Sequence, residues 1–194
     1  MNYSDKHKVL WATPMRAATR SCIPIQKYFG FDVIGHHGLQ IPEGKEDYYF
    51  VLNTRNPYTR MISIYHLFCL QFKIEPNNFN GWIRKEFNEK KRFPYDTLNL
   101  NYQIFLKEKI FKTPDLIIKL ENLYSDILKL PFFSDNSDEL FDIVNNNILT
   151  NHYSSGYDYN QYYNQDLADY VYSILEEDFV YFNYNKNSWK DGTS

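Results

Sequence analysis

Residues 48–72 constrain the fold most strongly, because a strand-forming run passes almost directly into a helical one. Residues 48–54 read YYFVLNT and are rich in the aromatic and β-branched side chains that favour strands. Residues 57–72, PYTRMISIYHLFCLQF, carry the largely apolar pattern of a helix. Strands followed by helices are the units from which α/β proteins are built, so this segment predicts that fold class.

The rest of the chain repeats the alternation. Short apolar runs predict further strands at 8–14, 31–35 and 114–123. Helical patterns occupy five more segments, at 16–31, 79–91, 98–111, 137–149 and 164–184. Pro24 lies inside the first of these, which predicts that this helix starts near Ile23 or is kinked. Strands that alternate with helices favour a mainly parallel sheet.

Composition, net charge and cysteine content narrow the kind of protein that the sequence can encode. No repeat, linker or shift in composition divides the 194 residues, which predicts a single domain, 1–194. The net charge of −3 excludes the broad basic field that attracts nucleic acid, so clustered arginines indicate a local anion site. Cys22 and Cys69 match no disulfide or zinc pattern and are expected as buried thiols. The sequence shows no signal-peptide pattern and no long apolar run, which predicts a cytoplasmic protein without a membrane span.

The segment TPMRAATRS, residues 13–21, stands between the first strand and the first helix. In a parallel sheet, ligands bind where strands end and helices begin, which places 13–21 and 53–63 on one rim. Small residues let a ligand approach the backbone, and a helix N-terminus supplies free N–H groups. We expect a phosphate cradle here, formed by Arg16, Ala17, Ala18, Thr19, Arg20 and Ser21. The alternative is a surface turn that carries arginines; the glycines and lysine of a Walker A loop are missing.

The segment RNPYTRMISIY, residues 55–65, follows the 48–54 strand. Arg55 can direct two N–H donors to one phosphate, and Ser63 lies two turns into the following helix. A shared anion for Arg55 and Ser63 is the functional interpretation. The structural alternative pairs Arg55 and Arg60 with surface carboxylates and leaves Ser63 as a small helix residue.

Taken together, these two segments resemble the sulfotransferase family, whose members use the sulfate donor PAPS. R-A-A-T-R is similar to the family loop P-[KR]-[ST]-[GA]-[ST]-[ST], and RNPYTRMISIY matches R-[ND]-P-x-x-R-x-x-S-x-Y. IIKLENL and the closing segment 162–184 also resemble family landmarks, in order, so the resemblance spans about residues 8–184. It implies a P-loop-NTPase-like three-layer fold with a central, mainly parallel sheet. It also implies that the 13–21 loop holds the 5′-phosphosulfate and that Arg55 and Ser63 hold the 3′-phosphate.

The first loop departs from the family pattern. Met15 stands between Pro14 and Arg16, and we align Arg16 with the basic position because this puts Ala18 at the small position and Thr19 at a hydroxyl position. In this register Ala17 and Arg20 replace residues that usually carry hydroxyls. Backbone N–H groups would then do most of the phosphate binding.

The histidines of GHHGLQIP, residues 35–42, are the candidates for a general base. A metal pair is disfavoured because adjacent side chains rarely converge, and we expect no metal site. In carbohydrate-type sulfotransferases a histidine in this region is the base, a role that suits a group with a pKa near working pH. The resemblance thus implies His36 or His37 as base, with Arg16 stabilising the leaving phosphate. Further candidates are a lid containing His152, Ser154 and Ser155, and Trp82, for which packing is the simpler interpretation; Glu121 is expected to be structural.

The activity that the resemblance implies is transfer of the sulfuryl group of PAPS to an acceptor hydroxyl, with a carbohydrate-type acceptor favoured over other small molecules. The short chain leaves the acceptor site open or completed by a second copy in a homodimer. Three alternatives remain. A small P-loop kinase would need a lysine and a magnesium apparatus, and a nucleic-acid-binding module is opposed by the net charge. A PAPS- or PAP-binding protein without catalysis is supported by the altered first loop.

Overall fold

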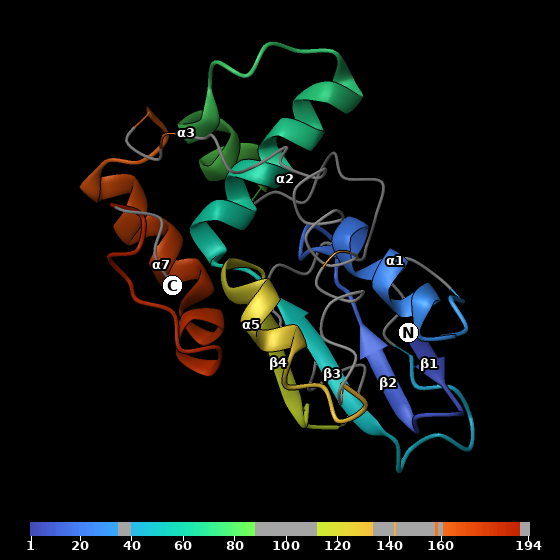
Figure 1. Ribbon diagram of the computed structural model, residues 1–194. Helices are drawn as coiled ribbons and strands as arrows, with labels where there is room; N and C mark the ends of the chain where they lie inside the picture. The colour runs from blue at the N-terminus through green and yellow to red at the C-terminus, as the bar shows by residue number, and fades with distance from the viewer. Residues whose placement is uncertain (35–39, 88–111, 134–141, 143–157, 159–160, 191–194) are drawn as a thin grey trace. The chain divides into compact units, whose positions relative to one another are not determined.

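The computed structural model describes residues 1–34, 40–87, 112–133, 142, 158 and 161–190 (Figure 1). The chain divides into two compact units. The first comprises Met1–Arg55 and Phe105–Tyr153, and the second comprises Asn56–Ile104 and Ser154–Ser194. The segments at 98–111 and 137–149, predicted as helices, lie outside the described residues apart from residue 142.

The first unit contains a four-stranded sheet in the order β1-β2-β3-β4. Its strands are β1 (Asn2–Ser4), β2 (Val9–Ala12), β3 (Tyr49–Thr54) and β4 (Leu116–Lys119). β2, β3 and β4 are parallel, and only β1 runs antiparallel to its neighbour. The predicted α/β class with a mainly parallel sheet is therefore confirmed.

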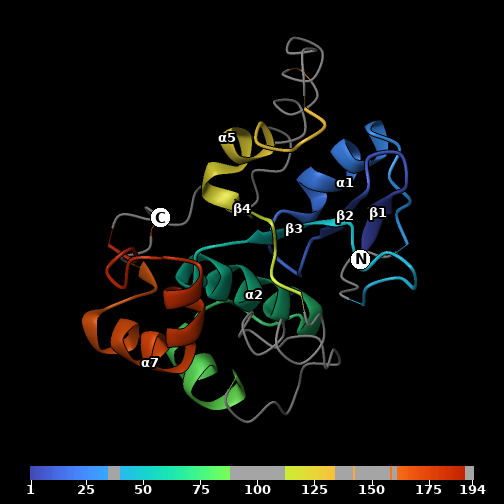
Figure 2. The same ribbon diagram turned by 90° about the horizontal axis from the view of Figure 1, so that it is seen from below.

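Helices α1 (Thr19–Tyr28) and α5 (Leu123–Ile127) cover the same face of this sheet (Figure 2). Alternate strand residues point into the core beneath them, which contains Val9, Trp11, Cys22, Ile25, Phe31, Val51, Ile118, Leu123, Ile127 and Leu130. The intervening residues Leu10, Phe50 and Leu52 are also buried. Burial on both faces explains why β2 and β3 have nearly continuous apolar sequences instead of alternating ones.

Three sequence predictions about the first unit were wrong in detail. Residues 31–34 form no strand; Asp32 makes only an isolated bridge to Tyr3, because the edge beside β2 is already occupied by β1. The 114–123 strand is limited to Leu116–Lys119, and a 3₁₀ turn, Leu120–Asn122, containing Glu121 follows it. Helix α1 begins at Thr19, four residues before Ile23, and therefore contains Pro24, although a proline inside a helix removes one i→i−4 hydrogen bond.

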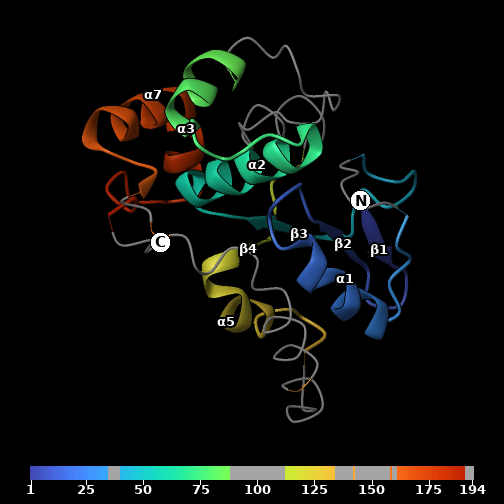
Figure 3. The same cartoon turned by 90° about the horizontal axis from the view of Figure 1, so that it is seen from above.

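The second unit contains α2 (Pro57–Phe72), α3 (Phe79–Gly81), a π-helical turn (Trp82–Phe87) and α7 (Gln165–Tyr181). The bounds of α2 match the predicted helix, and α7 lies within the predicted closing helix, with non-helical backbone angles at Leu175. Figure 3 shows α7 beside α2. The predicted 79–91 helix is described only as far as residue 87.

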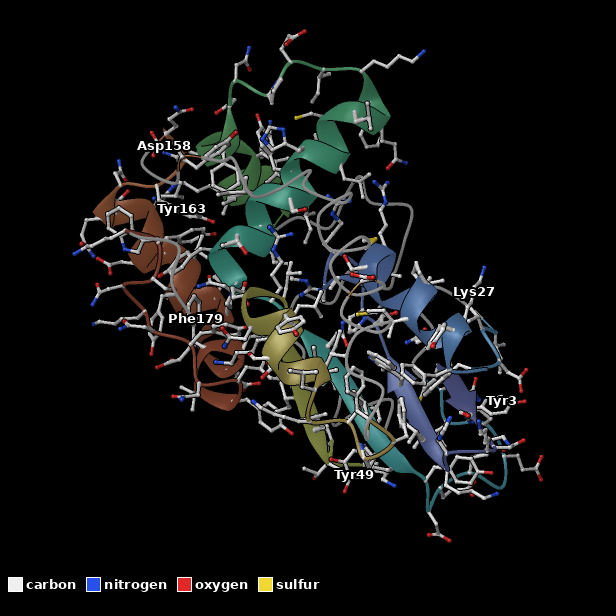
Figure 4. All side chains as sticks on the ribbon, in the orientation of Figure 1. Tyr3, Lys27, Tyr49, Asp158, Tyr163 and Phe179 are labelled. Carbon is white, nitrogen blue, oxygen red and sulfur yellow. The ribbon has the colours of Figure 1, made fainter. Side chains whose placement is uncertain are left out.

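Tyr58 is the centre of packing in the second unit. Its ring lies 5.0 Å from that of Tyr163 and 4.8 Å from that of Phe179, both labelled in Figure 4. Its hydroxyl donates to the carbonyl of Lys186 at 2.8 Å, while the Tyr163 hydroxyl donates to the Tyr58 carbonyl at 3.0 Å. These contacts hold α2, α7 and the segment after α7 together. Within the described residues, no helix has both the length and the apolar character needed to cross a membrane.

Candidate functional site

The candidate site is the loop of residues 13–18, which connects β2 to α1 in the first unit. β2 and β3 are parallel neighbours, with Ala12 opposite Leu52, so the loop leaves the sheet at the edge where β3 also ends. Arg55 directly follows β3, and its Nη1 lies 3.5 Å from the backbone oxygen of Arg16. The structure therefore brings together Arg16 and Arg55, two residues that the sequence assigned to different ends of one nucleotide.

The backbone of the loop is unusual because two residues other than glycine adopt left-handed angles. Arg16 has φ +65°, and Ala18 has φ +64° with ψ +19°. A left-handed residue with a Cβ costs about 1–2 kcal/mol. Ala17, between them, is fully buried, and its N–H donates to the carbonyl of Pro14 at 3.1 Å. Such strain persists only where the surroundings enforce it, and it commonly marks sites that bind a ligand.

The N-terminus of α1 has no side-chain cap. Its N-cap residue is Ala18, which has no oxygen to offer, whereas α2, α3 and α7 are capped by Asn56, Asn78 and Asn164. The amides of Ser21 and Cys22 turn back onto the Ala18 carbonyl. No hydrogen bond among the described residues takes up the amide of Ala18 or Thr19. The start of α1 thus presents backbone donors and the positive end of the helix dipole, an arrangement suited to an anion.

The hydroxyl of Thr19 has a role that the sequence did not predict. Its Oγ1 lies 3.2 Å from the carbonyl of Thr13 and 3.3 Å from that of Pro14, so its proton is donated inside the loop. Thr19 therefore closes the loop in this structure. Of the other predicted loop residues, Arg16 is half-buried, Arg20 is exposed and Ser21 is buried in the first turn of α1.

Asn53 lies beneath the loop and was missed by sequence reasoning. It is fully buried on β3, accepts a hydrogen bond from the indole N–H of Trp11 at 2.7 Å, and donates to the Ala17 carbonyl at 3.1 Å. It also donates to Cys22 Sγ at 3.0 Å. The one available signal was an asparagine inside the apolar run FVLNT.

Cys22 is a free, buried thiol, as predicted. Burial raises its pKa to about 12, and the hydrogen bond from Asn53 opposes this only partly. The thiol is therefore neutral near pH 7 and places no negative charge beneath the loop. A neutral sulfur at this position does not compete electrostatically with an anion bound at the start of α1.

Arg55 is a positively charged residue whose side chain contacts the loop backbone at the Arg16 carbonyl. Only 5% of the residue is exposed, although its side chain is charged. A guanidinium carries five N–H donors in a planar fork, and the contact with the Arg16 carbonyl engages one nitrogen. Because Arg55 contacts the loop backbone, its charge acts on whatever the loop binds.

Several positions of the RNPYTRMISIY segment after Arg55 have structural roles in the second unit. Asn56 caps α2 by accepting from the Tyr58 amide at 3.0 Å, and its own amide donates to Ser188 Oγ at 2.7 Å. Pro57 occupies the first turn of α2, where a missing N–H costs nothing. The Tyr65 hydroxyl accepts from the amide of Asn78 at 2.8 Å. Arg60 and Ser63 are both buried on α2.

The remaining candidates divide into two groups. His36, His37, His152, Ser154 and Ser155 lie outside the described residues. Trp82 is buried and packs against Tyr65, with ring centroids 5.3 Å apart, in agreement with the packing interpretation. Among the described residues, no group of three or more metal-ligating side chains converges.

Comparisons of the chain with protein-family models, with curated proteins and with solved structures found no match. The strongest observations are the strained loop, the uncapped start of α1 and the guanidinium of Arg55.

Proposed function

We propose that this chain is a PAPS-dependent sulfotransferase with a P-loop-NTPase-like arrangement of β2, loop and α1. The observation that carries the proposal is the loop itself. Arg16 and Ala18 have left-handed backbone angles, and the Ala18 and Thr19 amides lie at the uncapped start of α1. Arg55 contacts the same loop. Backbone donors, a helix dipole and a guanidinium are the groups that bind a phosphate or phosphosulfate.

The choice of PAPS over a nucleoside triphosphate is supported by the residues present. A kinase loop of this type uses glycines and a lysine, together with a magnesium ion held by a Ser/Thr and an acidic residue. Here the loop reads TPMRAATRS, with arginines and alanines in their place. The RNPYTRMISIY pattern adds Arg55 and Ser63 for the 3′-phosphate that distinguishes PAPS from ATP.

In the proposed reaction an acceptor oxygen attacks sulfur opposite the bridging oxygen. The bond between sulfur and that oxygen breaks, and its electron pair stays on the 5′-phosphate of PAP. The Ala18 and Thr19 amides and the Arg16 guanidinium stabilise the growing charge, while His36 or His37 takes the acceptor's proton. We expect Arg16→Ala to lower turnover by on the order of 10²-fold, as loss of an oxyanion donor does.

The acceptor proposed is a hydroxyl, with a carbohydrate-type acceptor favoured by the histidine pair and a homodimer as one way to complete its site. A non-catalytic PAP-binding protein is the second candidate. It is favoured by one observation: the Thr19 hydroxyl donates inward, and Ala17 and Arg20 supply no further hydroxyl. The two candidates share the nucleotide site and differ only in turnover.

The test is calorimetric titration with PAP, with ATP and AMP as control ligands, on the wild type and on Arg55→Ala. Loss of a charged hydrogen-bond donor should weaken PAP binding roughly 10- to 100-fold. Arg84→Ala is the matched control, because Arg84 pairs with Asp166 on the surface of the second unit at 2.7 Å. PAP binding that survives in the control and is lost in Arg55→Ala supports the nucleotide site. Labelled PAPS with a panel of acceptors then separates enzyme from binding protein, and absence of PAP binding to folded wild type rejects both.

A further inference from the structure

Asn53 joins three parts of the first unit through one side-chain amide. Its Oδ1 accepts from Trp11 on β2, and its Nδ2 donates to Ala17 in the loop and to Cys22 on α1. The indole nitrogen of tryptophan can only donate, so it requires the oxygen of Asn53 and fixes which way the amide faces. The nitrogen of Asn53 is therefore directed at the Ala17 carbonyl.

The hydrogen bond to Ala17 determines where the next amide points. A trans peptide is planar, and its C=O and N–H point in opposite directions. Since the Ala17 carbonyl faces Asn53, the N–H of Ala18 faces away from the sheet. The second donor of Asn53 ties the first turn of α1 to the same amide, so the loop and the helix start are held in one relative orientation.

We propose that Asn53 is the positioning residue of the anion site: from β3 it aims the Ala18 and Thr19 amides at the bound anion. This inference rests on the proposed function of the loop. The core residues near Asn53, Val51 and Ile118, are apolar, so an apolar side chain would also fit at position 53. A buried amide is costly unless its polar atoms are hydrogen-bonded. Asn53 has a partner for its oxygen and two for its nitrogen.

The test compares Asn53→Leu with Gln26→Leu, an identical kind of change at another fully buried amide of the first unit. Gln26 lies on α1, and its side-chain oxygen accepts from Asn2 of β1 at 2.6 Å, a bond that involves no residue of the loop. PAP affinity is measured by calorimetry at a temperature where urea unfolding shows each variant folded. We expect Asn53→Leu to weaken PAP binding about tenfold or more and Gln26→Leu to leave it unchanged, because only the first removes the hydrogen bond that orients the loop. Equal PAP affinity in both variants would overturn the proposal.

Trp11→Phe provides the second variant, which keeps an aromatic ring in the core and removes the indole donor together with part of the buried ring. If Asn53→Leu does not fold, the PAP affinity of Trp11→Phe is the test. Binding weakened severalfold supports the proposal, and wild-type affinity overturns it. ¹H–¹⁵N spectra of the free proteins keep this test separate from the proposed function. Should wild type bind no PAP, the sulfotransferase proposal fails. Displaced Ala18 and Thr19 amide signals in Trp11→Phe, but not in Gln26→Leu, would still support the positioning role, and undisplaced signals would overturn it.

Discussion

The left-handed backbone of Ala18 makes a direct prediction about stability. With φ +64° and ψ +19°, its Cβ costs about 1–2 kcal/mol relative to glycine. Ala18→Gly removes that cost, but the greater freedom of glycine in the unfolded chain returns about 0.4–1 kcal/mol. The net expectation is a rise of about 0.5–1 kcal/mol in the free energy of unfolding.

Ala17→Gly is the matched control, because Ala17 is the neighbouring alanine and is not left-handed. Its side chain is fully buried, so glycine loses the methyl contact as well as backbone entropy. We expect a decrease of about 1–2 kcal/mol. Urea unfolding followed by circular dichroism measures both variants. If Ala18→Gly destabilises the protein as much as Ala17→Gly does, the loop is not strained and the argument from strain to a ligand site loses its basis.

Three further predictions concern named contacts. Asn56→Ala should lower the free energy of unfolding by about 1–2 kcal/mol through loss of the α2 cap, as judged by urea titration. Tyr58→Phe should cost about 0.5–1.5 kcal/mol because the Lys186 carbonyl loses its donor; an unchanged midpoint would contradict this. Burial raises the pKa of Cys22 to about 12 from 9.0, so the native thiol keeps its proton where the unfolded thiol has lost it. Its contribution is therefore complete below pH 9 and is lost as pH rises towards 12, and Cys22→Ala should flatten the fall of stability with pH in that window.

The sequence predicted the β3–α2 segment well because local signals coincide there. Strand-forming residues end at Thr54, and the helical pattern begins at Pro57. The three-residue strand β1 was missed because a strand this short carries too little periodicity to detect. The 31–35 strand was predicted from composition, yet pairing depends on which edge of the sheet is free, a property that only the tertiary structure determines.

The candidate site was predictable in position and not in conformation. The arginines and alanines of the loop are visible in the sequence, but left-handed angles at Arg16 and Ala18 are not, because glycine is the usual signal for them. Asn53 was overlooked because its importance depends on the loop folding back over β3. Thr19 was assigned to a ligand because its type suited one, although its proton is donated to the loop's own carbonyls.

The RNPYTRMISIY segment shows how far a pattern match can be trusted. Asn56 and Pro57 begin α2, and Tyr65 holds the turn at Asn78, so these matches are explained by folding alone. Arg55 is different, since it is a nearly buried cation whose nitrogen approaches the carbonyl of a strained loop. The case for a nucleotide therefore depends on Arg55 and the 13–18 loop, and loss of PAP binding in Arg55→Ala tests it more directly than any further match to the pattern.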